Sequence, residues 1–334
     1  MAKSPASKKN IASNRPASQA AKRPPTRTPA SQAAKRPSAR ASSGRPAGLF
    51  TWLAIGLVVV IVATLVLVKV LSGSPSTTSK GSFSPVDTTT MSQLAGVPMS
   101  VFNTVGVTSP VVQVTSPIPI KSQPPLTAQT SSGTTVPEVL YLGAEYCPYC
   151  AAQRWSTIIA LSRFGKWSGL GNTASYAHDT YPNTASFTFV RSSFKSKYIV
   201  FKGIEEYTNY LNAAGTNYQL LQTPTKAEMA LVVKYDTPKY IPGLTKSDGN
   251  PIPFLTMDNK FLVSGASFSP DTLTNLTRSA IATGLTDSSS PVTDAIIVSA
   301  NYQTAAICSL TNNKPSNVCT SSGVMAAKKK MGIK

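Results

Sequence analysis

The stretch EVLYLGAEYCPYCAAQRW, residues 138–155, constrains the fold of this chain more than any other feature. Its apolar run 139–142 is typical of a strand that is buried on both faces. Apolar residues then recur at helical spacing, and Gly165 predicts the end of that helix. Two of the four cysteines, Cys147 and Cys150, stand at the junction. The pattern therefore predicts a strand that leads through a dithiol directly into a helix.

This placement gives the two sulfurs different roles. Pro148 falls in the first turn of the expected helix, where its missing N–H costs nothing. Cys147 then lies where free backbone N–H groups and the helix dipole favour an anion. Because the thiolate is the nucleophile in disulfide exchange, this position predicts that Cys147 is the attacking cysteine. Cys150 follows one helical turn later and is placed to resolve a mixed disulfide.

Charge is concentrated at the two ends of the chain. Residues 1–48 hold 11 Lys or Arg and no Asp or Glu, and further lysines gather in residues 328–334. All 13 acidic residues fall between 81 and 327, together with 15 basic ones. The net charge of +19 therefore describes the ends, while the body is nearly neutral. We expect no specific nucleic-acid partner.

Residues 1–47 are expected to be a disordered, basic, cytoplasmic tail. They consist mainly of Pro, Ser, Ala, Lys and Arg, and so cannot bury enough apolar surface to offset chain entropy. The segment PASQAAKRP occurs in this region at 16–24 and again at 29–37. Duplication of a low-complexity tail is the plain explanation. Contact with anionic lipid headgroups is the sharper alternative, at about 1 kcal/mol for each basic residue near the surface.

The segment GLFTWLAIGLVVVIVATLVLV, residues 48–68, contains no charge. A helix needs about 20 apolar residues to cross the hydrocarbon, so we expect residues 48–71 to form one transmembrane helix in the lipid bilayer. A cleaved signal peptide has a shorter apolar core after a shorter basic lead. Because the basic lead stays cytoplasmic, the expected location is the cell membrane, single-pass, with the C-terminal body extracytoplasmic.

Composition divides the remaining chain into three segments. Residues 72–83 are short polar residues with Gly and Pro, which predicts a flexible linker. Residues 84–320 carry the apolar content and are expected to form one extracytoplasmic domain, within which the prolines of 110–135 favour extended, irregular chain. Residues 321–334 are expected to be a basic C-terminal tail.

Strand, CPYC and helix in this order resemble the thioredoxin superfamily, and CPYC is the dithiol of many glutaredoxins. The segments LYLGAEYCPYCAAQRW, ALSRFGKWSGLG and YPNTASFTF resemble more closely the thioredoxin-like domain-of-unknown-function family numbered 929, over roughly residues 83–310. The resemblance implies an α/β fold with a thioredoxin-like central sheet and flanking helices. The middle of the chain is longer than that fold needs, so we also expect an insertion. The family has no established substrate, and the resemblance therefore implies more about fold than about function.

The same resemblance implies a cis-proline opposite the dithiol, at the start of a β-hairpin. Residues 254–263 predict such a hairpin, with a two-residue Asp-Asn turn. Pro253 matches the cis-proline, and Ile252 before it would offer backbone groups to an extended substrate. Pro251 is a competing choice, and an ordinary trans turn proline is the alternative for both. A single capped helix is then expected over 269–284.

Cys308 and Cys319 have ten residues between them, which is not the spacing of a redox motif. Disulfides persist outside the cytoplasm, so a structural disulfide is the favoured interpretation. A relay that exchanges electrons with Cys147 and Cys150 is one alternative. Zinc held by the four cysteines is another, but the spacing is not the usual paired one. We expect no metal and no other cofactor.

Four residues near the motif have weaker signals. Tyr149, inside the motif, is expected to shape access to the dithiol. His178, the only histidine, is more typical of a solvated loop than of a catalytic base. Glu145 either influences the thiolate or is simply solvated. Arg154 is expected to be an exposed helix residue.

The favoured function is a membrane-anchored, extracytoplasmic thiol–disulfide oxidoreductase. Cys147 and Cys150 would exchange disulfides with protein thiols or disulfides outside the membrane, while Ile252, Pro253 and Tyr149 contact the substrate. A membrane or envelope redox partner is implied, and the direction of electron flow stays open. Two alternatives are a non-catalytic thioredoxin-like scaffold with a fixed disulfide, and delivery of copper(I) or zinc through the CPYC thiolates.

Overall fold

The structure is a computed structural model that describes residues 83–107 and 111–333. The expected basic tail 1–47, the expected transmembrane helix 48–71 and nearly all of the expected linker 72–83 lie outside the described residues. Within the described ranges, no helix combines the length and the apolar character needed to cross a membrane.

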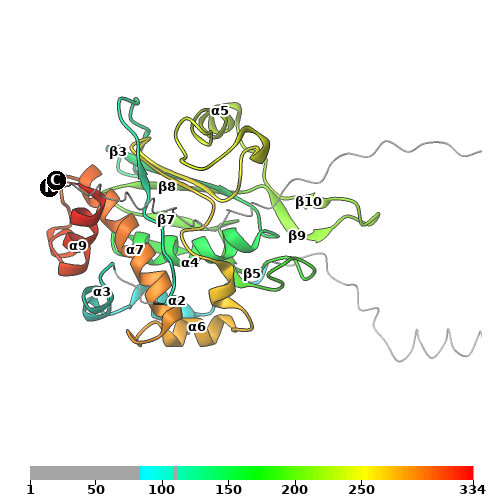
Figure 1. Ribbon diagram of the computed structural model, residues 1–334, viewed down its shortest axis with the longest axis horizontal. Coiled ribbons are helices and arrows are strands. Elements are labelled where there is room, and N and C mark those ends of the chain that lie inside the picture. Colours follow the sequence, from blue (N-terminus) through cyan, green and yellow to red (C-terminus); the bar gives the residue numbers. More distant parts are fainter. Residues whose placement is uncertain (1–82, 108–110, 334) are drawn as a thin grey trace, which may run out of the picture. The chain divides into compact units, whose positions relative to one another are not determined.

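The described residues form a mixed α/β fold around a six-stranded sheet (Figure 1). The strand order is β1-β12-β11-β3-β2, and β8 pairs in parallel with residues 138–143 of β3. The other pairings in this sheet are antiparallel. Its strands are β1 (Ile118–Pro119), β2 (Thr127–Gln129), β3 (Thr135–Gly143), β8 (Val200–Glu205), β11 (Phe254–Met257) and β12 (Phe261–Ser264).

Helices cover both faces of this sheet. Figure 1 shows α5 on one face and α4 with α7 on the other. The α-helices are α2 (Thr88–Ala95), α3 (Met99–Val105), α4 (Pro148–Ser162), α5 (Lys226–Tyr235), α6 (Arg278–Gly284), α7 (Pro291–Leu310), α8 (Ser316–Cys319) and α9 (Ser322–Met331). Two short 3-10 helices are η1 (Lys246–Asp248) and η2 (Pro270–Leu273).

β3 is the central strand, and the sequence predicts why. Residues 139–142 of this strand are almost completely buried, which confirms the strand predicted to be buried on both faces. Side chains of a strand alternate between faces. Val139 and Tyr141 accordingly pack in the cluster on the α4 and α7 side, whereas Leu142 packs in the cluster that includes residues of α5. This double burial fixes the register of the strand, because a shift by one residue would exchange the two faces.

Three two-stranded sheets complete the β-structure. They pair β4 (Lys166–Ser168) with β7 (Ser193–Lys195), β5 (Gly171–Ala174) with β6 (Ala185–Thr188), and β9 (Tyr207–Leu211) with β10 (Tyr218–Leu220). The segment 165–185, which is rich in glycine, contains β4 and β5, and both pair with strands further along the chain.

The helix expected over 269–284 is interrupted. Ser269 caps η2, which ends after one turn, and α6 begins only at Arg278. Between them Asn275 adopts a left-handed conformation, with φ of +61°, which a continuous helix does not accommodate. Thr277 then provides a second N-cap, because its side chain accepts a hydrogen bond from the Ala280 N–H at 3.1 Å.

Residues 321–334 include a folded helix and are not a loose basic tail. Val324 and Ala327 lie three residues apart on one face of α9 and are completely buried. Lys328 is also buried and donates a hydrogen bond to the Asn313 side chain. The run of three lysines suggested a tail, but two small apolar residues at helical spacing are enough to dock this segment. The folded body therefore extends beyond residue 320.

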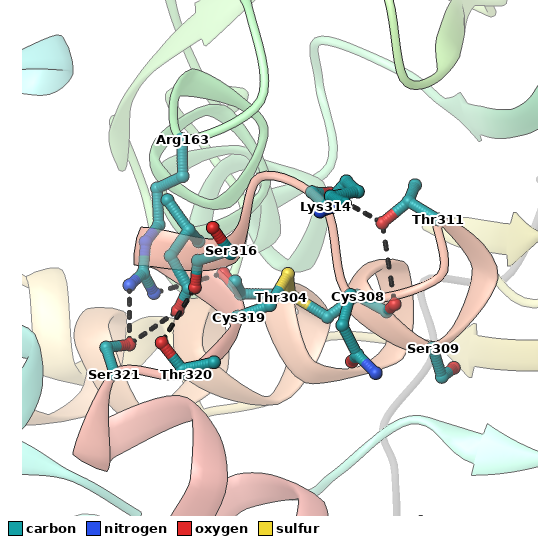
Figure 2. Close-up of a disulfide and its surroundings, with 12 residues drawn as sticks. Arg163, Thr304, Cys308, Ser309, Thr311, Lys314, Ser316, Cys319, Thr320 and Ser321 are labelled. Carbon is teal, nitrogen blue, oxygen red and sulfur yellow. Dashed lines mark hydrogen bonds between the residues drawn. A yellow bond between two sulfur atoms is a disulfide. The ribbon is translucent and has the colours of Figure 1, made fainter.

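The predicted disulfide between Cys308 and Cys319 is present (Figure 2). It joins the last turn of α7 to α8, with 5.6 Å between the two Cα atoms. Both cysteines are buried. Arg163 lies beside this region and donates a hydrogen bond to the Ser321 hydroxyl at 3.2 Å (Figure 2). The bridge thus closes the short loop that connects α7 to α8.

Replacement of both Cys308 and Cys319 by Ala should lower the free energy of unfolding by about 3 kcal/mol, because a bridge across a loop of this length restricts the unfolded chain. Chemical denaturation of the full-length chain measures the change. Reductant should lower the stability of the native chain by a similar amount and leave the double variant unaffected. A loss below about 1 kcal/mol would show that the bridge is not a structural staple.

Candidate active site

The dithiol lies where β3 passes into α4, as the sequence predicts. Cys147 is the N-cap of α4 and has an extended backbone, with φ of −79° and ψ of 120°. Pro148 occupies the first helical position. The Cys150 N–H donates a hydrogen bond to the Cys147 Sγ at 3.2 Å. The Cys147 sulfur therefore takes the place that a Ser or Asp oxygen usually takes at a helix start, and such a position favours an anionic form.

The loop that precedes β11 contacts the dithiol. The Ile252–Pro253 peptide is cis, so the geometry selects Pro253 over Pro251. β11 pairs with β3 in the register Phe254 to Leu142, and this pairing holds the loop beside the end of β3. The Cys147 thiol donates to the Ile252 carbonyl at 3.7 Å. Two of the residues predicted to contact substrate thus lie next to the predicted nucleophile.

Both sulfurs are enclosed. Cys147 and Cys150 are each 0% exposed and belong to an apolar cluster that includes Ile252, Phe254 and Tyr235. The position of Cys147 at a helix start agrees with the sequence analysis, but its burial was not expected. An attacking sulfur must reach its partner, so disulfide exchange at this site requires part of this cover to move.

The cover over the dithiol loop is aromatic. Tyr146, directly before Cys147, stacks on Tyr218 of β10 with 4.0 Å between ring centroids and an interplanar angle of 3°. Tyr176 contacts the same Tyr218 ring edge-on at 5.3 Å. Burial raises the pKa of Tyr218 to about 12, and the nearby Cys147 contributes to this rise. The β9–β10 hairpin therefore forms one wall around the candidate site.

A backbone hydrogen bond fastens this hairpin to the dithiol loop, and a side-chain hydrogen bond fastens it to β5. The Glu145 N–H donates to the Tyr207 carbonyl at 2.9 Å. The Asn209 side chain donates to the Ala174 carbonyl at 2.9 Å. The far end of the hairpin, around Gly215, is exposed and makes no comparable contact with the site in the described part of the chain. The hairpin is thus held at its base and free at its tip.

Tyr149 and His178 lie at the rim of the site. Tyr149, expected to shape access, is half-buried and contacts Tyr181 edge-on at 6.0 Å. Burial raises the pKa of Tyr149 to about 12. His178 is exposed and contacts the Tyr176 ring, so it does not lie against either sulfur as a base.

Arg154 is completely buried, which corrects the prediction of an exposed helix residue. Its Nε and Nη2 donate to the two oxygens of Glu205 at 2.8 and 2.6 Å. Nη2 also donates to the Ala144 carbonyl at 2.7 Å. Both side chains are 0% exposed. Glu205 was not predicted as part of the site, although an acid at the end of a strand and the single charged residue of α4 were two available signals.

The environment of Cys150 combines opposing effects on its pKa. Burial raises the pKa of this thiol well above its usual value, and the neighbouring Cys147 raises it further. The Arg154 charge and a hydrogen bond from the Ala144 backbone act in the other direction. Because the cost of burying a charge is the largest of these effects, Cys150 is a neutral thiol at neutral pH.

Asp236 is a buried acid on the wall formed by α5. It follows Tyr235 of the dithiol cluster, and neither of its carboxylate oxygens accepts a hydrogen bond from a described residue. Burial raises the pKa of Asp236 to about 7, and the nearby Ser264 side chain offsets part of this rise. The acid is therefore protonated below neutral pH and carries an uncompensated charge above it.

The family model described as Domain of unknown function (DUF929) matches residues 126–309, which is more than half of the chain. This match confirms the resemblance to the family numbered 929. None of the curated proteins and none of the solved structures matches the chain.

The raised pKa of Asp236 predicts a loss of stability with rising pH. Between about pH 4 and 7 the folded state binds more protons than the unfolded state, so the free energy of unfolding falls across this window. In the native chain, titration of Asp236 should lower the free energy of unfolding by up to about 4 kcal/mol between pH 4 and pH 8. Asp236→Asn should remove this decrease. Thermal or chemical unfolding at both pH values measures this difference.

The exposed Asp271 provides a matched control for that experiment, because Asp271→Asn removes a carboxylate that is not buried. If Asp236→Asn and Asp271→Asn change the pH dependence equally, Asp236 does not titrate in the window proposed.

Proposed function

We propose that this chain, which belongs to the DUF929 family, is a membrane-anchored, extracytoplasmic thiol–disulfide oxidoreductase that uses the CPYC dithiol. The observation that carries the proposal is the position of Cys147 at the N-cap of α4, with its sulfur accepting the Cys150 N–H. A helix start favours the thiolate, which is the reactive form in exchange. The resolving cysteine follows one turn later on the same helix.

The arrangement around the dithiol supports a thioredoxin-like interpretation of the mixed sheet. β3 leads into the dithiol and α4, β8 lies parallel to β3, and the β11–β12 hairpin follows the cis Ile252–Pro253 peptide. This combination brings an extended loop and a dithiol together from segments about a hundred residues apart. Such a loop offers main-chain groups to a partner chain whose cysteine approaches Cys147.

The proposed chemistry is two successive displacements at sulfur. The Cys147 thiolate attacks one sulfur of a partner disulfide, the partner S–S bond breaks, and the released partner thiolate takes a proton from water. Cys150 then loses its proton and attacks the Cys147 sulfur of the mixed disulfide. The Cys147–Cys150 bond forms as the second partner thiolate leaves, so two electrons pass from the dithiol to the partner. The reverse sequence oxidises a partner dithiol.

The proposed substrates are protein thiols or disulfides outside the membrane, contacted through Ile252, Pro253 and Tyr149. A membrane or envelope redox partner would restore the dithiol after each cycle, and its potential relative to that of the dithiol would set the direction of transfer. The uncharged run within residues 48–71 supports a single membrane anchor, with the basic residues before it on the cytoplasmic side. The location proposed is therefore the cell membrane, with the dithiol domain on the outer side.

A second candidate function follows from the burial of both sulfurs. A thioredoxin-like scaffold that binds a partner without exchanging disulfides does not need an accessible thiol. In such a protein Cys147 and Cys150 would stay as a fixed disulfide and would act only as apolar filling between α4 and the loop at Ile252. The two candidates differ in whether Cys147 forms a covalent intermediate.

Cys150→Ala in the full-length chain should accumulate mixed disulfides on Cys147, because the residue that resolves them is absent. Non-reducing electrophoresis followed by mass spectrometry detects these adducts. Cys147→Ala, the matched control, should form none, and the variant that lacks both cysteines should behave in the same way. If Cys150→Ala forms no adduct with any protein or with a dye-labelled peptide disulfide, the scaffold is the better description.

Exchange also requires the aromatic cover to open, and Tyr218→Ala should make opening easier. A stacked aromatic pair contributes about 0.5 to 1.5 kcal/mol, so its loss should raise the rate of Cys147 alkylation by iodoacetamide about two- to tenfold. Tyr210→Ala is the matched control, because Tyr210 lies on the same hairpin but is 49% exposed. Equal rates in the two variants would mean that the hairpin does not limit access.

A further inference from the structure

The buried pair of Arg154 and Glu205 has no part in the displacements described above. It is nevertheless joined to the dithiol loop by a shared acceptor. The Ala144 carbonyl accepts a hydrogen bond from the Cys147 N–H at 3.3 Å and another from the Arg154 Nη2 at 2.7 Å. The Arg154 guanidinium and the backbone N–H of the proposed nucleophile thus share one carbonyl acceptor.

Helix geometry places the same guanidinium near the resolving cysteine. Cys150 and Arg154 are four residues apart on α4, so their side chains lie on the same face, one turn apart. Both are 0% exposed, so water does not screen the interaction between them. The Arg154 Nη1 and the Tyr141 hydroxyl, both buried, form no hydrogen bond to any described residue. The cation therefore keeps unused N–H groups in a region that also holds a sulfur.

Glu205 keeps the cation in place. It is the last residue of β8 and lies opposite Gly143 in the parallel register of β3 and β8. Both of its oxygens accept hydrogen bonds from Arg154, and its own N–H donates to the Gln222 side chain at 2.8 Å. The bidentate contact fixes the plane of the guanidinium, which a lysine could not do in the same way.

We propose that Arg154 is a positioning residue that stabilises the anionic form of Cys150 when this sulfur attacks the Cys147 mixed disulfide, and that Glu205 orients its guanidinium. This inference rests on the proposed function. In the resolving step the Cys150 thiol gives its proton to water, the Cys150–Cys147 bond forms, and the bond from Cys147 to the partner sulfur breaks. A negative charge must exist on Cys150 before the attack, in a site that burial makes unfavourable for it.

The electrostatics of the site agree with this role. The Arg154 charge lowers the pKa of Cys150 against the larger effect of burial. An opposite charge within about 4 to 6 Å lowers a pKa by about 1 to 3 units in general. The other titratable groups whose charges act on this region are Cys147, Tyr141, Tyr146, Tyr218, Glu145, Glu205 and Glu206, and none of them is a cation. Within the described residues, Arg154 is thus the only cation whose charge acts on this region in these interactions.

The test is the pH profile of the resolving step in the full-length chain. The reduced chain is mixed with an excess of a dye-labelled peptide disulfide in a single-turnover experiment. Release of the second peptide thiol then reports the attack by Cys150. The rate follows the thiolate fraction of Cys150 and levels off above its pKa. Two variants change the charge in opposite directions: Arg154→Met together with Glu205→Gln removes the cation with its partner, whereas Glu205→Gln alone leaves the cation without an anion.

The double variant should shift the pH profile upward by about one unit and slow release at pH 7 by about three- to tenfold. Glu205→Gln alone should shift the profile downward. The plateau rate at high pH should stay within about twofold, because a sulfur that is already ionised no longer needs the cation. A purely structural role for the pair would shift both variants in the same direction, or change the plateau instead of the midpoint.

Two further variants keep the test decisive. Arg154→Lys retains a cation and should keep most of the native profile, which separates loss of the charge from loss of the arginine side chain. If the double variant does not fold, the downward shift expected for Glu205→Gln carries the test. Arg163→Met is the matched control, because Arg163 is a largely buried arginine at the opposite end of α4. Profiles that do not move in any Arg154 or Glu205 variant overturn this inference alone. Absence of the mixed disulfide in the native chain overturns the proposed function.

Discussion

The pairing of β3 on both sides, with burial on both faces, positions every part of the candidate site. β8 and β11 flank the C-terminal half of this strand, so its last residue, Gly143, lies in a fixed place between two neighbouring strand ends. A Cβ at Gly143 would overlap the Tyr141 ring, so only glycine permits this close approach. The pairing of β8 with β3 places Glu205 opposite Gly143, and the pairing of β11 with β3 positions the preceding loop, which contains Ile252. The positions of the dithiol loop, the ion pair and the loop at Ile252 thus all depend on one strand.

Two physical effects compete at the sulfurs, and they affect the two cysteines differently. A helix N-terminus stabilises an anion by about 0.3 to 2 kcal/mol, and Cys147 receives this effect directly through the Cys150 N–H. Burial without compensation shifts a pKa by up to about 3 to 5 units, which is larger. Cys150 lies inside the first turn, does not cap the helix, and has only the Arg154 charge and the Ala144 N–H to oppose burial. Any negative charge on Cys150 therefore depends on the Arg154 charge.

The sequence predicted those parts of the site that depend on local chemistry. The strand before the dithiol, Pro148 at the first helical position and the hairpin at 254–263 each follow from periodicity or turn residues, and the structure confirms them. The resemblance to the family added Pro253, which local chemistry could not single out from Pro251. The ion pair was missed because its partners are 51 residues apart, and no local pattern states that an acid on one strand will meet an arginine on a helix.

Misjudged boundaries have the same cause. The period of the segment 269–284 fits a helix, yet the left-handed conformation of Asn275 breaks it once the chain packs. The lysines of 328–330 suggest a tail, yet the small residues before them dock against the body. At the C-terminus tertiary contacts outweighed a local signal of a few tenths of a kcal/mol per residue. Boundaries that depend on long-range packing cannot be read from short windows.

Burial alone does not decide between an exchange enzyme and a scaffold, but the ion pair beside the dithiol bears on the question. Desolvation of a buried pair generally costs as much as its attraction returns, so apolar side chains would stabilise a scaffold at least as well. The Arg154 charge also lowers the pKa of Cys150, so the pair gains a use beyond its hydrogen bonds if that sulfur becomes negative at some stage. The aromatic cover is compatible with that use, because a hairpin held at its base and free at its tip can open without disturbing β3. The structure thus combines an enclosed dithiol with a cation whose charge favours the anionic form of Cys150.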